Sequence, residues 1–369
     1  MKKNLARFFF LLVFIAIFFS GCTKKVPTPA TATYRANLQR TAVFDSAAAL
    51  TQFSRVKWKF SAVNWIFSSP EIVNDRIIFG GVNGGLYSLK LNSKVDWIFR
   101  SLYGIYSTPS VVDGRIFFGG MDQYIYSLDF ETGQKQWSFY SDKGFYSSPA
   151  VVNGRVFIGG LDSIFYALRA RNGREVWQFK TRGKIYSSPA YDDGILYFGS
   201  EDGHLYALES KSGQLKWKFN TGEGIMSTPA ISHDMILIGS KDAYLYAIDK
   251  ASGYIKWRFR THQPITASPA VSRGTVFIGS WDHNFYAVDL ATGREKWMFK
   301  TRQPVLGSAS VAGNTVYFGS RDSTLYALNV QNGQERWHFK TGGSISATPL
   351  VFDKKVYIGS QDFYLYCIE

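Results

Sequence analysis

Seven aspartates recur along the chain at intervals of 40 residues, and carboxylates repeated in this way are candidate calcium ligands or general bases. They are Asp122, Asp162, Asp202, Asp242, Asp282, Asp322 and Asp362. Each follows a Gly-Gly or Gly-Ser pair by one residue, and Asn83 takes this place in the first repeat. An Asp in a tight turn accepts hydrogen bonds from the backbone N–H groups that follow it. We therefore interpret the seven aspartates as turn caps and predict no metal site for them.

The other residues that commonly carry chemistry form no recognisable site. Five histidines are spread over the chain without the His-x-x-x-His spacing of metal ligands. There are two cysteines, Cys22 and Cys367, and no adjacent pair. No nucleophile stands in a recognisable arrangement with a base. The sequence therefore predicts a protein that is not an enzyme and has no cofactor, with Cys367 as a buried free thiol.

Apart from Cys22, all these residues lie within a sequence repeat that carries one Trp at an equivalent position in each unit, so the fold of the repeat determines where they lie. Trp58 is followed by Trp97 after 39 residues and then by one Trp every 40 residues as far as Trp337. A fixed period of this length indicates a repeat architecture. In residues 265–300, four short runs rich in Val, Ile, Phe and Tyr are separated by Gly, Asp, Asn and Ser, which predicts four strands and no helix. Four antiparallel strands form one blade of a β-propeller.

The order of the strands predicts how the ring closes. The repeats begin with a lone fourth strand, 55–60, and end after a third strand, 363–368. Eight sets of first-to-third strands and eight Trp-bearing strands make eight blades. We therefore predict an all-β, eight-bladed propeller of four-stranded antiparallel blades over residues 54–369. In this ring the N-terminal strand completes the C-terminal blade and leaves no open sheet edge.

Residues 1–21 have the pattern of an export signal. A basic start is followed by an unbroken apolar run over 8–19, which is too short to span a bilayer. The tetrapeptide Phe-Ser-Gly-Cys at 19–22 resembles a bacterial lipobox with Phe in place of the more usual Leu. We expect a lipoprotein signal peptide over 1–21 and a lipid anchor on Cys22. The alternative is an ordinary secretory signal with a chance Cys.

Residues 22–53 are expected to form a lipid-anchored tether and a lead-in to the propeller. The tether, 23–32, is rich in Thr, Pro and Ala and has little to bury. The lead-in, 33–53, is expected to lie across the blade that closes the ring. No acidic residue directly follows Cys22, which favours delivery to an outer membrane. We expect an exported, lipid-anchored protein on the periplasmic face of that membrane.

The repeats carry the tryptophan-docking motif of a known propeller family. Residues 287–297 read Ala-x-Asp-x-x-Thr-Gly-x-x-x-Trp, and 247–257 match with Ser252 before the Gly. The unit that ends at Trp97 is one residue short and lacks the Gly. Over most of its length the chain thus resembles the PQQ-like (quinoprotein-type) β-propeller repeat family. This resemblance implies that each Trp is wedged between neighbouring blades.

Within this family more than one function is open. The resemblance to quinoprotein enzymes implies a quinone stacked on a Trp, a calcium ion, a catalytic Asp and often a vicinal Cys pair, and no such Cys pair exists here. The lipobox, the tether and eight uninterrupted blades are most similar to the BamB family of outer-membrane assembly lipoproteins. That resemblance implies a non-enzymatic scaffold that binds the barrel-assembly pore and unfolded outer-membrane proteins. A PQQ-dependent dehydrogenase and an envelope module that binds glycan or peptide are the alternatives.

Positions that differ between otherwise similar repeats are free to carry specificity, and we expect them at one mouth of the channel. The loops after the fourth strands and those between second and third strands share this mouth. Early blades have apolar or aromatic residues there, and other blades often have basic ones. Aromatic residues and Arg are frequent anchors of protein interfaces. The predicted partner-binding residues are Leu102, Tyr103, Tyr106, Met121, Tyr146, Leu161, Arg182, Tyr186, Trp281 and Arg302.

The three tyrosines of this set have a second interpretation, in which they pack between blades and never meet solvent. For Met121, Leu161 and Trp281, on short turns, exposure is expected. A basic sector is predicted from Arg182, Lys184, Lys241, Arg260, His262, Arg302 and Arg321. The formal net charge of +14 favours contact with anionic lipid or acidic partners. We expect no nucleic-acid role, because Lys and Arg are scattered rather than clustered.

Overall fold

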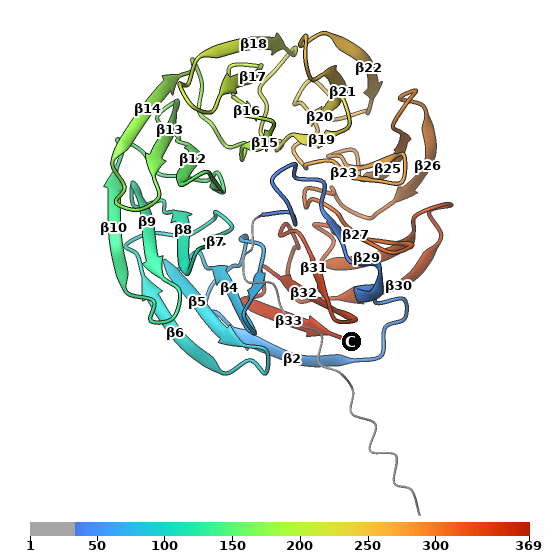
Figure 1. The fold of residues 1–369 in the computed structure, drawn as a ribbon. Helices are drawn as coiled ribbons and strands as arrows, with labels where there is room; N and C mark the ends of the chain where they lie inside the picture. Colours follow the sequence, from blue (N-terminus) through green and yellow to red (C-terminus); the bar gives the residue numbers. More distant parts are fainter. Residues whose placement is uncertain (1–33) are drawn as a thin grey trace, which may run out of the picture.

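The computed structural model describes residues 34–369, which form eight β-sheets arranged as blades around a central channel (Figure 1). The prediction of an all-β, eight-bladed propeller is confirmed. In each blade the short first strand lies next to the channel and the fourth strand lies at the rim. Among these residues no helix is long and apolar enough to cross a membrane. The predicted signal peptide over 1–21, the lipid site Cys22 and the tether over 23–32 lie outside the described residues.

The strands of the first four blades follow one another along the chain. They are β3 (Glu71–Val73), β4 (Arg76–Gly80), β5 (Gly85–Lys90) and β6 (Val95–Arg100) in the first; β7 (Ser110–Val112), β8 (Arg115–Gly119), β9 (Tyr124–Asp129) and β10 (Lys135–Tyr140) in the second; β11 (Ala150–Val152), β12 (Arg155–Gly159), β13 (Ile164–Arg169) and β14 (Glu175–Lys180) in the third; and β15 (Ala190–Asp192), β16 (Ile195–Gly199), β17 (His204–Glu209) and β18 (Leu215–Asn220) in the fourth.

The last four blades continue the pattern, with additions from the N-terminal segment. The strands are β19 (Ala230–Ser232), β20 (Met235–Gly239), β21 (Tyr244–Asp249) and β22 (Ile255–Arg260) in the fifth; β23 (Ala270–Ser272), β24 (Thr275–Gly279), β25 (Asn284–Asp289) and β26 (Glu295–Lys300) in the sixth; β27 (Ser310–Ala312), β28 (Thr315–Gly319), β29 (Thr324–Asn329), β30 (Glu335–Lys340) and β1 (Val43–Phe44) in the seventh; and β31 (Leu350–Phe352), β32 (Lys355–Gly359), β33 (Tyr364–Ile368) and β2 (Val56–Ser61) in the eighth. A 3₁₀ turn, η1 (Ser46–Ala48), lies between β1 and β2.

Burial explains why inner and outer strands differ in sequence. A second or third strand is covered by a neighbouring blade on each face, so it reads as an apolar run, as in β21. A fourth strand has one covered face and alternates, as in β22, where Lys256, Arg258 and Arg260 are exposed. Within residues 34–369, eight clusters of buried apolar residues lie one at each blade–blade interface. The core is therefore a ring rather than a single centre.

The fourth-strand tryptophans join neighbouring blades, as the family resemblance implied. The indole Nε1 of Trp177 donates to the carbonyl oxygen of Ser210 in the next blade at 3.1 Å. Its ring lies against Gly213, where an added Cβ would stand 2.6 Å from the ring atom Cε3. The same hydrogen bond spans 33 residues at the six other tryptophans from the first to the seventh. Trp337 instead donates to Leu50 of the lead-in.

The ring closes between the N-terminal strand and the end of the chain, as predicted. Strand β2 pairs antiparallel with β33, with Trp58 opposite Cys367. Backbone hydrogen bonds between Arg55 and Glu369 extend the pairing in both directions, at 2.8 and 3.0 Å. The Glu369 carboxylate also accepts from the side chains of Arg55 and Lys57. The closing sheet is thus a complete four-stranded blade.

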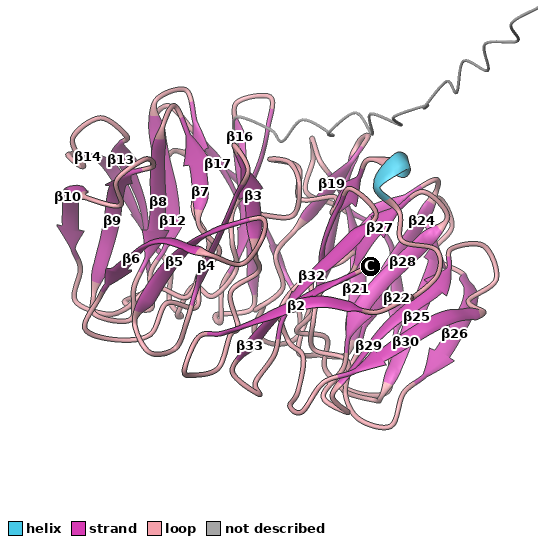
Figure 2. Ribbon diagram, turned by 90° about the horizontal axis from the view of Figure 1, so that it is seen from below, coloured by secondary structure: helices cyan, strands magenta, loops and turns pink. Residues whose placement is uncertain are grey.

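The lead-in lies across the closing region over only part of its length. Strand β1 pairs in parallel with β27 and so gives the seventh blade a fifth strand, which was not predicted. The turn η1 then lies at the seventh and eighth blades, where the Lys354 N–H donates to the Ala48 carbonyl oxygen at 3.1 Å. Figure 2 shows η1 at one face of the ring. Residues 34–42 enter the central channel.

We predict that Gly213→Ala destabilises the protein through the tryptophan contact. The new methyl group would collide with Trp177, and Gly213 has a φ of +75° that an L side chain rarely adopts. The free energy of unfolding should fall by about 2–4 kcal/mol in a denaturant titration. The control is Gly194→Ala in the same blade, which has a φ of +83° but open space around the added Cβ. Equal decreases in the free energy of unfolding of the two variants would show that the contact with Trp177 does not contribute to stability.

We also predict that Cys367 is unreactive while the ring is closed. The thiol is free and fully buried, and burial raises its pKa to about 12, so almost no thiolate is present at pH 8. In a Cys22→Ser background, a thiol reagent such as Ellman's reagent should react only after denaturant is added. Stoichiometric labelling of the folded protein would contradict the closed pairing of β2 with β33.

Candidate functional site: the channel and its loop-bearing mouth

Within residues 34–369, six of the seven recurring aspartates accept a backbone hydrogen bond within their own turn, the exception being Asp122. Six also join one blade to the next at the mouth, and here Asp162 is the exception among the described contacts. Asp202 Oδ1 accepts from the backbone N–H of His204 at 3.1 Å. Asp202 Oδ2 accepts from the Tyr206 hydroxyl at 2.8 Å and from the backbone N–H of Arg182, in the preceding loop, at 2.8 Å. Burial opposes ionisation of Asp202, but these hydrogen bonds outweigh it and lower the pKa of the carboxyl. The predicted turn-cap role is confirmed for every recurring aspartate except Asp122, whose Oδ1 has no hydrogen-bond partner in the described part of the chain, and the contact between blades is additional to it.

The two loop sets expected at the mouth do lie together. The Met121 N–H, in a turn between second and third strands, donates to the Gly104 carbonyl oxygen at 3.0 Å. The backbone N–H of Leu102 donates to Asp122 Oδ2 at 3.2 Å, and the backbone N–H of Arg302 donates to Asp322 Oδ2 of the next blade at 3.1 Å. These hydrogen bonds fix the loop backbones, so the side chains that leave them are presented from a rigid surface.

Exposed apolar side chains gather on the first two of these loops. Leu102 is 85% exposed and Tyr103 is 65% exposed. Val63 and Trp65, in the loop before the first blade, are also exposed, at 75% and 45%. Counted from the preceding fourth strand, Val63 has the same repeat position as Leu102, and this signal in the sequence was overlooked. We call Val63, Trp65, Leu102 and Tyr103 the apolar arc.

The other turn residues predicted at the mouth are less exposed than Leu102. Met121 and Leu161 are half-buried. Trp281 is 37% exposed, and its indole Nε1 donates to Thr266 Oγ1 at 3.0 Å. The guanidinium of Arg321 lies 5.8 Å from the centroid of the Trp281 ring. Trp281 therefore bridges the mouth and the channel wall.

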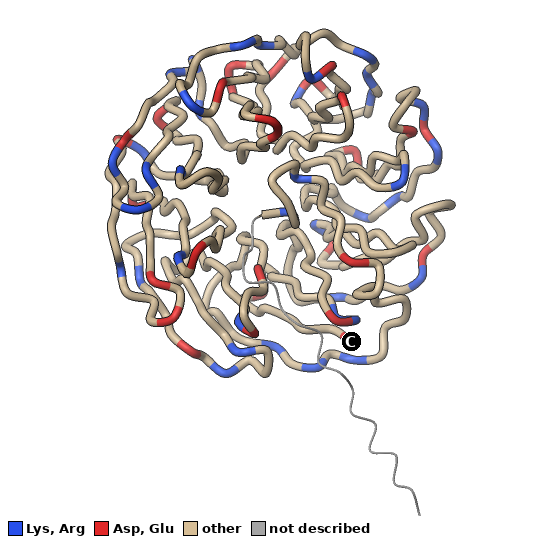
Figure 3. Tube along the Cα trace, in the orientation of Figure 1, with Lys and Arg blue, Asp and Glu red and all other residues tan. Residues whose placement is uncertain are grey.

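The basic sector is weaker than the residue types suggested. The ammonium group of Lys241 forms an ion pair with Glu201 at 2.7 Å, so this cation is neutralised. Arg182, Lys184 and Arg302 are exposed at the mouth. Figure 3 shows Lys and Arg spread round the rim of the ring rather than gathered in one block.

The three predicted tyrosines line the channel and do not pack between blades. Tyr106 stacks on Phe67 with ring centroids 5.3 Å apart and on Tyr146 at 5.2 Å. Tyr186 meets Tyr146 edge to face at 5.5 Å. Burial and the neighbouring tyrosines raise the pKa of Tyr146 to about 12. Together with Phe67, the tyrosines form a continuous aromatic wall over one half of the channel.

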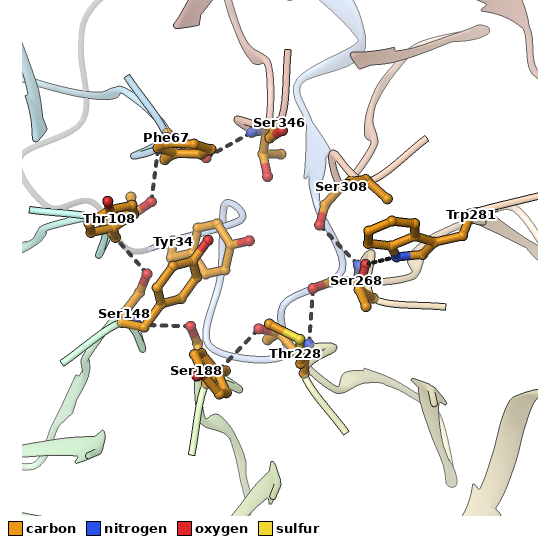
Figure 4. A pocket seen from close by; sticks show the side chains of 18 residues that line it. Tyr34, Phe67, Thr108, Ser148, Ser188, Thr228, Ser268, Trp281, Ser308 and Ser346 are labelled. Atoms are coloured by element: carbon orange, nitrogen blue, oxygen red, sulfur yellow. Dashed lines mark hydrogen bonds between the residues drawn. The ribbon is translucent and has the colours of Figure 1, made fainter. Parts of the chain in front are cut away.

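A ring of hydroxyl groups lies below this wall, one from the residue before each motif Pro or its equivalent. The ring consists of Ser69, Thr108, Ser148, Ser188, Thr228, Ser268, Ser308 and Thr348. Each is no more than 6% exposed. Backbone N–H groups donate to the hydroxyl oxygen one blade further on, over 2.9–3.1 Å, at seven of the eight steps (Figure 4). The hydroxyl ring thus joins blades around the channel.

The lead-in fills the channel beneath the hydroxyl ring. The inner edges of β15, β19, β23 and β27 present N–H groups to the channel, and carbonyl oxygens of residues 38–42 accept from all four at 2.8–3.0 Å. The Arg40 Nε donates to Pro189 at 2.9 Å, and Arg35 donates to the Pro269 carbonyl oxygen. Both guanidinium groups are buried, and burial lowers the pKa of each to about 10. Tyr34 lies in the channel as part of the cavity wall.

The residues around the channel do not fit a calcium-bound quinone. Calcium takes oxygen ligands from carboxylates and amides, yet no Asp, Glu, Asn or Gln lines the cavity. Among residues 34–369, no three His, Cys, Asp or Glu side chains gather as a metal site would require. The sequence also has no adjacent Cys pair. The residues that line this cavity therefore lack the oxygen ligands that a calcium-bound quinone would need.

A family model described as outer membrane protein assembly factor BamB matches residues 45–181, 121–228 and 220–369. The chain belongs to this family. The family assignment agrees with the repeat resemblance recognised from the docking motif. A search of curated proteins found no match.

Solved structures of BamB and of quinoprotein enzymes share the fold. BamB from Moraxella catarrhalis is 18% identical, with a TM-score of 0.75 over 85% of this chain and 99% of that one. Quinohemoprotein alcohol dehydrogenase from Comamonas testosteroni is 13% identical, with a TM-score of 0.80 over 91% and 80%. A europium-containing methanol dehydrogenase is 14% identical, with a TM-score of 0.79 over 91% of each chain. At these identities the likeness concerns the fold alone.

We predict that Asp202 contributes to stability at neutral pH and loses this contribution in acid. Because its pKa is lower in the folded protein, its stabilisation is present above the ordinary Asp pKa near 3.8 and is lost as the pH falls through the folded value. In Asp202→Asn the melting temperature should therefore fall less between pH 5 and pH 2.5 than in the unchanged protein. Asp193→Asn, at an exposed turn, is the matched control. Identical acid profiles for Asp202→Asn and the unchanged protein would rule this contribution out.

Proposed function

We propose that this chain is a non-enzymatic, lipid-anchored scaffold that binds protein partners of the cell envelope. Its role would be BamB-like, in the assembly and insertion of outer-membrane β-barrel proteins. The observation that carries the proposal is the apolar arc, in which Val63, Trp65, Leu102 and Tyr103 are exposed on loops fixed by hydrogen bonds. Exposed apolar groups of this kind mark protein interaction surfaces.

The rigidity of the mouth supports binding of a folded partner domain. The Val82 N–H donates to the Trp65 carbonyl oxygen at 3.0 Å, and the Ser101 N–H donates to Gly84 at 2.8 Å. These bonds connect the loop before the first blade to the loop after it through one turn. Because the loops are already ordered, binding would cost little conformational entropy. A periplasmic domain of the barrel-assembly pore is the partner that the family suggests.

The charged residues of the mouth support an acidic surface on the partner beside the apolar contact. Arg182 and Arg302 are exposed, and the backbone of each is attached to an aspartate of the next blade. Rim charges mainly raise the association rate and fix orientation. Unfolded outer-membrane proteins are a second proposed class of partner, because an extended chain could pair with backbone at the mouth.

The N-terminal sequence supports an exported, membrane-attached location. The expected signal peptide and the Cys22 lipid would place the propeller at the periplasmic face of the outer membrane. This location agrees with the family match. Electrophoretic mobility and mass analysis of the mature protein would detect the lipid directly.

We predict that Leu102→Asp combined with Tyr103→Asp weakens partner capture by at least about tenfold, because charges replace apolar anchors at the centre of the proposed contact. Crosslinking and pull-down from native membranes would measure recovery of the barrel-assembly pore. The melting temperature should not change, since both side chains are exposed.

The matched control for this experiment is Tyr254→Asp. Tyr254 is 77% exposed in a turn between third and fourth strands, which lies at the opposite end of the blade from the mouth. It should leave capture intact. Equal loss in the control, or capture of glycan in place of the pore, would overturn the proposal. Reduction of a dye by an alcohol after addition of PQQ and calcium would instead favour the dehydrogenase alternative.

A further inference from the structure

The channel contains a cavity of about 250 Å³ that is lined mainly by aromatic and aliphatic side chains near the mouth and by hydroxyl groups at depth. The outer tier has the aromatic wall on one side and Met226, Thr266, Leu306 and Ser346 on the other. The inner tier is the hydroxyl ring, and Tyr34 contributes to the wall from the lead-in. Figure 4 shows residues from many blades facing this one space. The arrangement suits a molecule with one polar end and one apolar end.

The hydroxyl ring is a ring of unused donors. At seven steps a hydroxyl oxygen already accepts a backbone N–H from the preceding blade. Within residues 34–369 none of the eight hydroxyl groups donates a hydrogen bond in return, so their protons are available. A buried hydroxyl that already accepts one hydrogen bond still has its own proton to donate, and this proton recognises an acceptor. The group that best matches several donors at once, and brings no donor of its own, is a carboxylate.

The charges beneath the ring favour the same group. Arg35 and Arg40 are buried there, and burial raises the pKa of Glu71, the carboxyl that acts on Arg40, well above its usual range. Within the described residues, Nε and Nη1 of Arg35 have no hydrogen-bond partner although the side chain is only 2% exposed. The Nη2 of Arg35 donates a hydrogen bond to the carbonyl oxygen of Pro269, which directly follows the ring residue Ser268. An anion in the cavity would therefore find positive charge below it and no carboxylate in the cavity wall.

The lead-in is held under backbone strain in this position. Arg35, Ala36, Arg40 and Ala42 have φ angles of 60°, 72°, 59° and 58°, in the left-handed region that residues with a Cβ disfavour. Such conformations persist where the surroundings impose them, and they are frequent at binding sites. Both the backbone strain and the burial of two guanidinium groups lower the stability of the folded protein. A bound anion would offset part of the unfavourable free energy of burying the two positive charges.

We propose that the cavity binds a small organic carboxylate with a flat apolar body, the carboxylate facing the hydroxyl ring and the body lying against the aromatic wall. This inference is independent of the apolar arc and of the proposed scaffold role. A neutral sugar fits less well, because its own hydroxyl protons would meet a tier of donors. An organic cation is excluded by the charges of Arg35 and Arg40. The carboxylate belongs either to a free acid or to the C-terminal residue of a polypeptide.

The test uses the full chain and three probes of matched size and shape. Isothermal titration calorimetry should show one site for 3-phenylpropionate and at least about tenfold weaker binding of 3-phenylpropionamide, which keeps the ring and removes the charge. N-acetylphenylalanine distinguishes the two sources. If it binds as well as 3-phenylpropionate, the site accepts a chain end; if only 3-phenylpropionate binds, the ligand is a free acid.

Variants locate the site. Ser148→Ala removes one hydroxyl of the ring, and Arg35→Met removes the positive charge at similar volume; each should weaken binding of 3-phenylpropionate about tenfold. Ser138→Ala, an exposed hydroxyl on β10, is the matched control and should leave affinity unchanged. Melting temperatures identify a variant that has lost its fold. Equal affinity for acid and amide in the unchanged protein, or no binding of the acid at millimolar concentration, would overturn the proposal without reliance on any variant.

Discussion

The whole structure depends on each blade having its apolar faces covered by its neighbours. A single four-stranded sheet exposes apolar residues on both sides of its inner strands, so it is stable only within a closed ring. The tryptophan of each fourth strand joins two blades by packing on the next blade's turn and donating to a carbonyl oxygen there. The pairing of β2 with β33 is essential for the same reason, because without it the last blade would lack its outer strand.

Since repeated residues maintain the ring, the positions that vary are available for binding. The aspartate turns fix the loop backbones at the mouth, and the hydroxyl ring fixes the entry of each first strand. Side chains such as Leu102 and Tyr103 can therefore differ from their counterparts in other blades without loss of the fold. The resulting surface is asymmetric, with an apolar arc over the first two blades and scattered cations elsewhere.

The lead-in introduces the second asymmetry. It satisfies inner-edge N–H groups of the fourth to seventh blades and brings two arginines into the channel, while the aromatic wall occupies the side of the first to fourth blades. BamB and quinoprotein dehydrogenases share this propeller fold, so the fold cannot distinguish a scaffold from an enzyme. The distinction rests on side chains, and here the cavity has hydroxyl donors and aromatic rings where a calcium-bound quinone would need carboxylates.

The sequence by itself determined the blade number, the strand order, the closure of the ring and the turn-capping aspartates, because these follow from local patterns repeated every 40 residues. It also placed Leu102 and Arg182 at the mouth, since loops of known order must share one end of a blade. Only the tertiary structure decided the path of the lead-in, where Arg35 and Arg40 look like ordinary surface charges until contacts with prolines more than 100 residues away are formed. It likewise decided that Tyr146 faces the channel and that Lys241 is paired, because both depend on side chains from neighbouring blades that no single repeat contains.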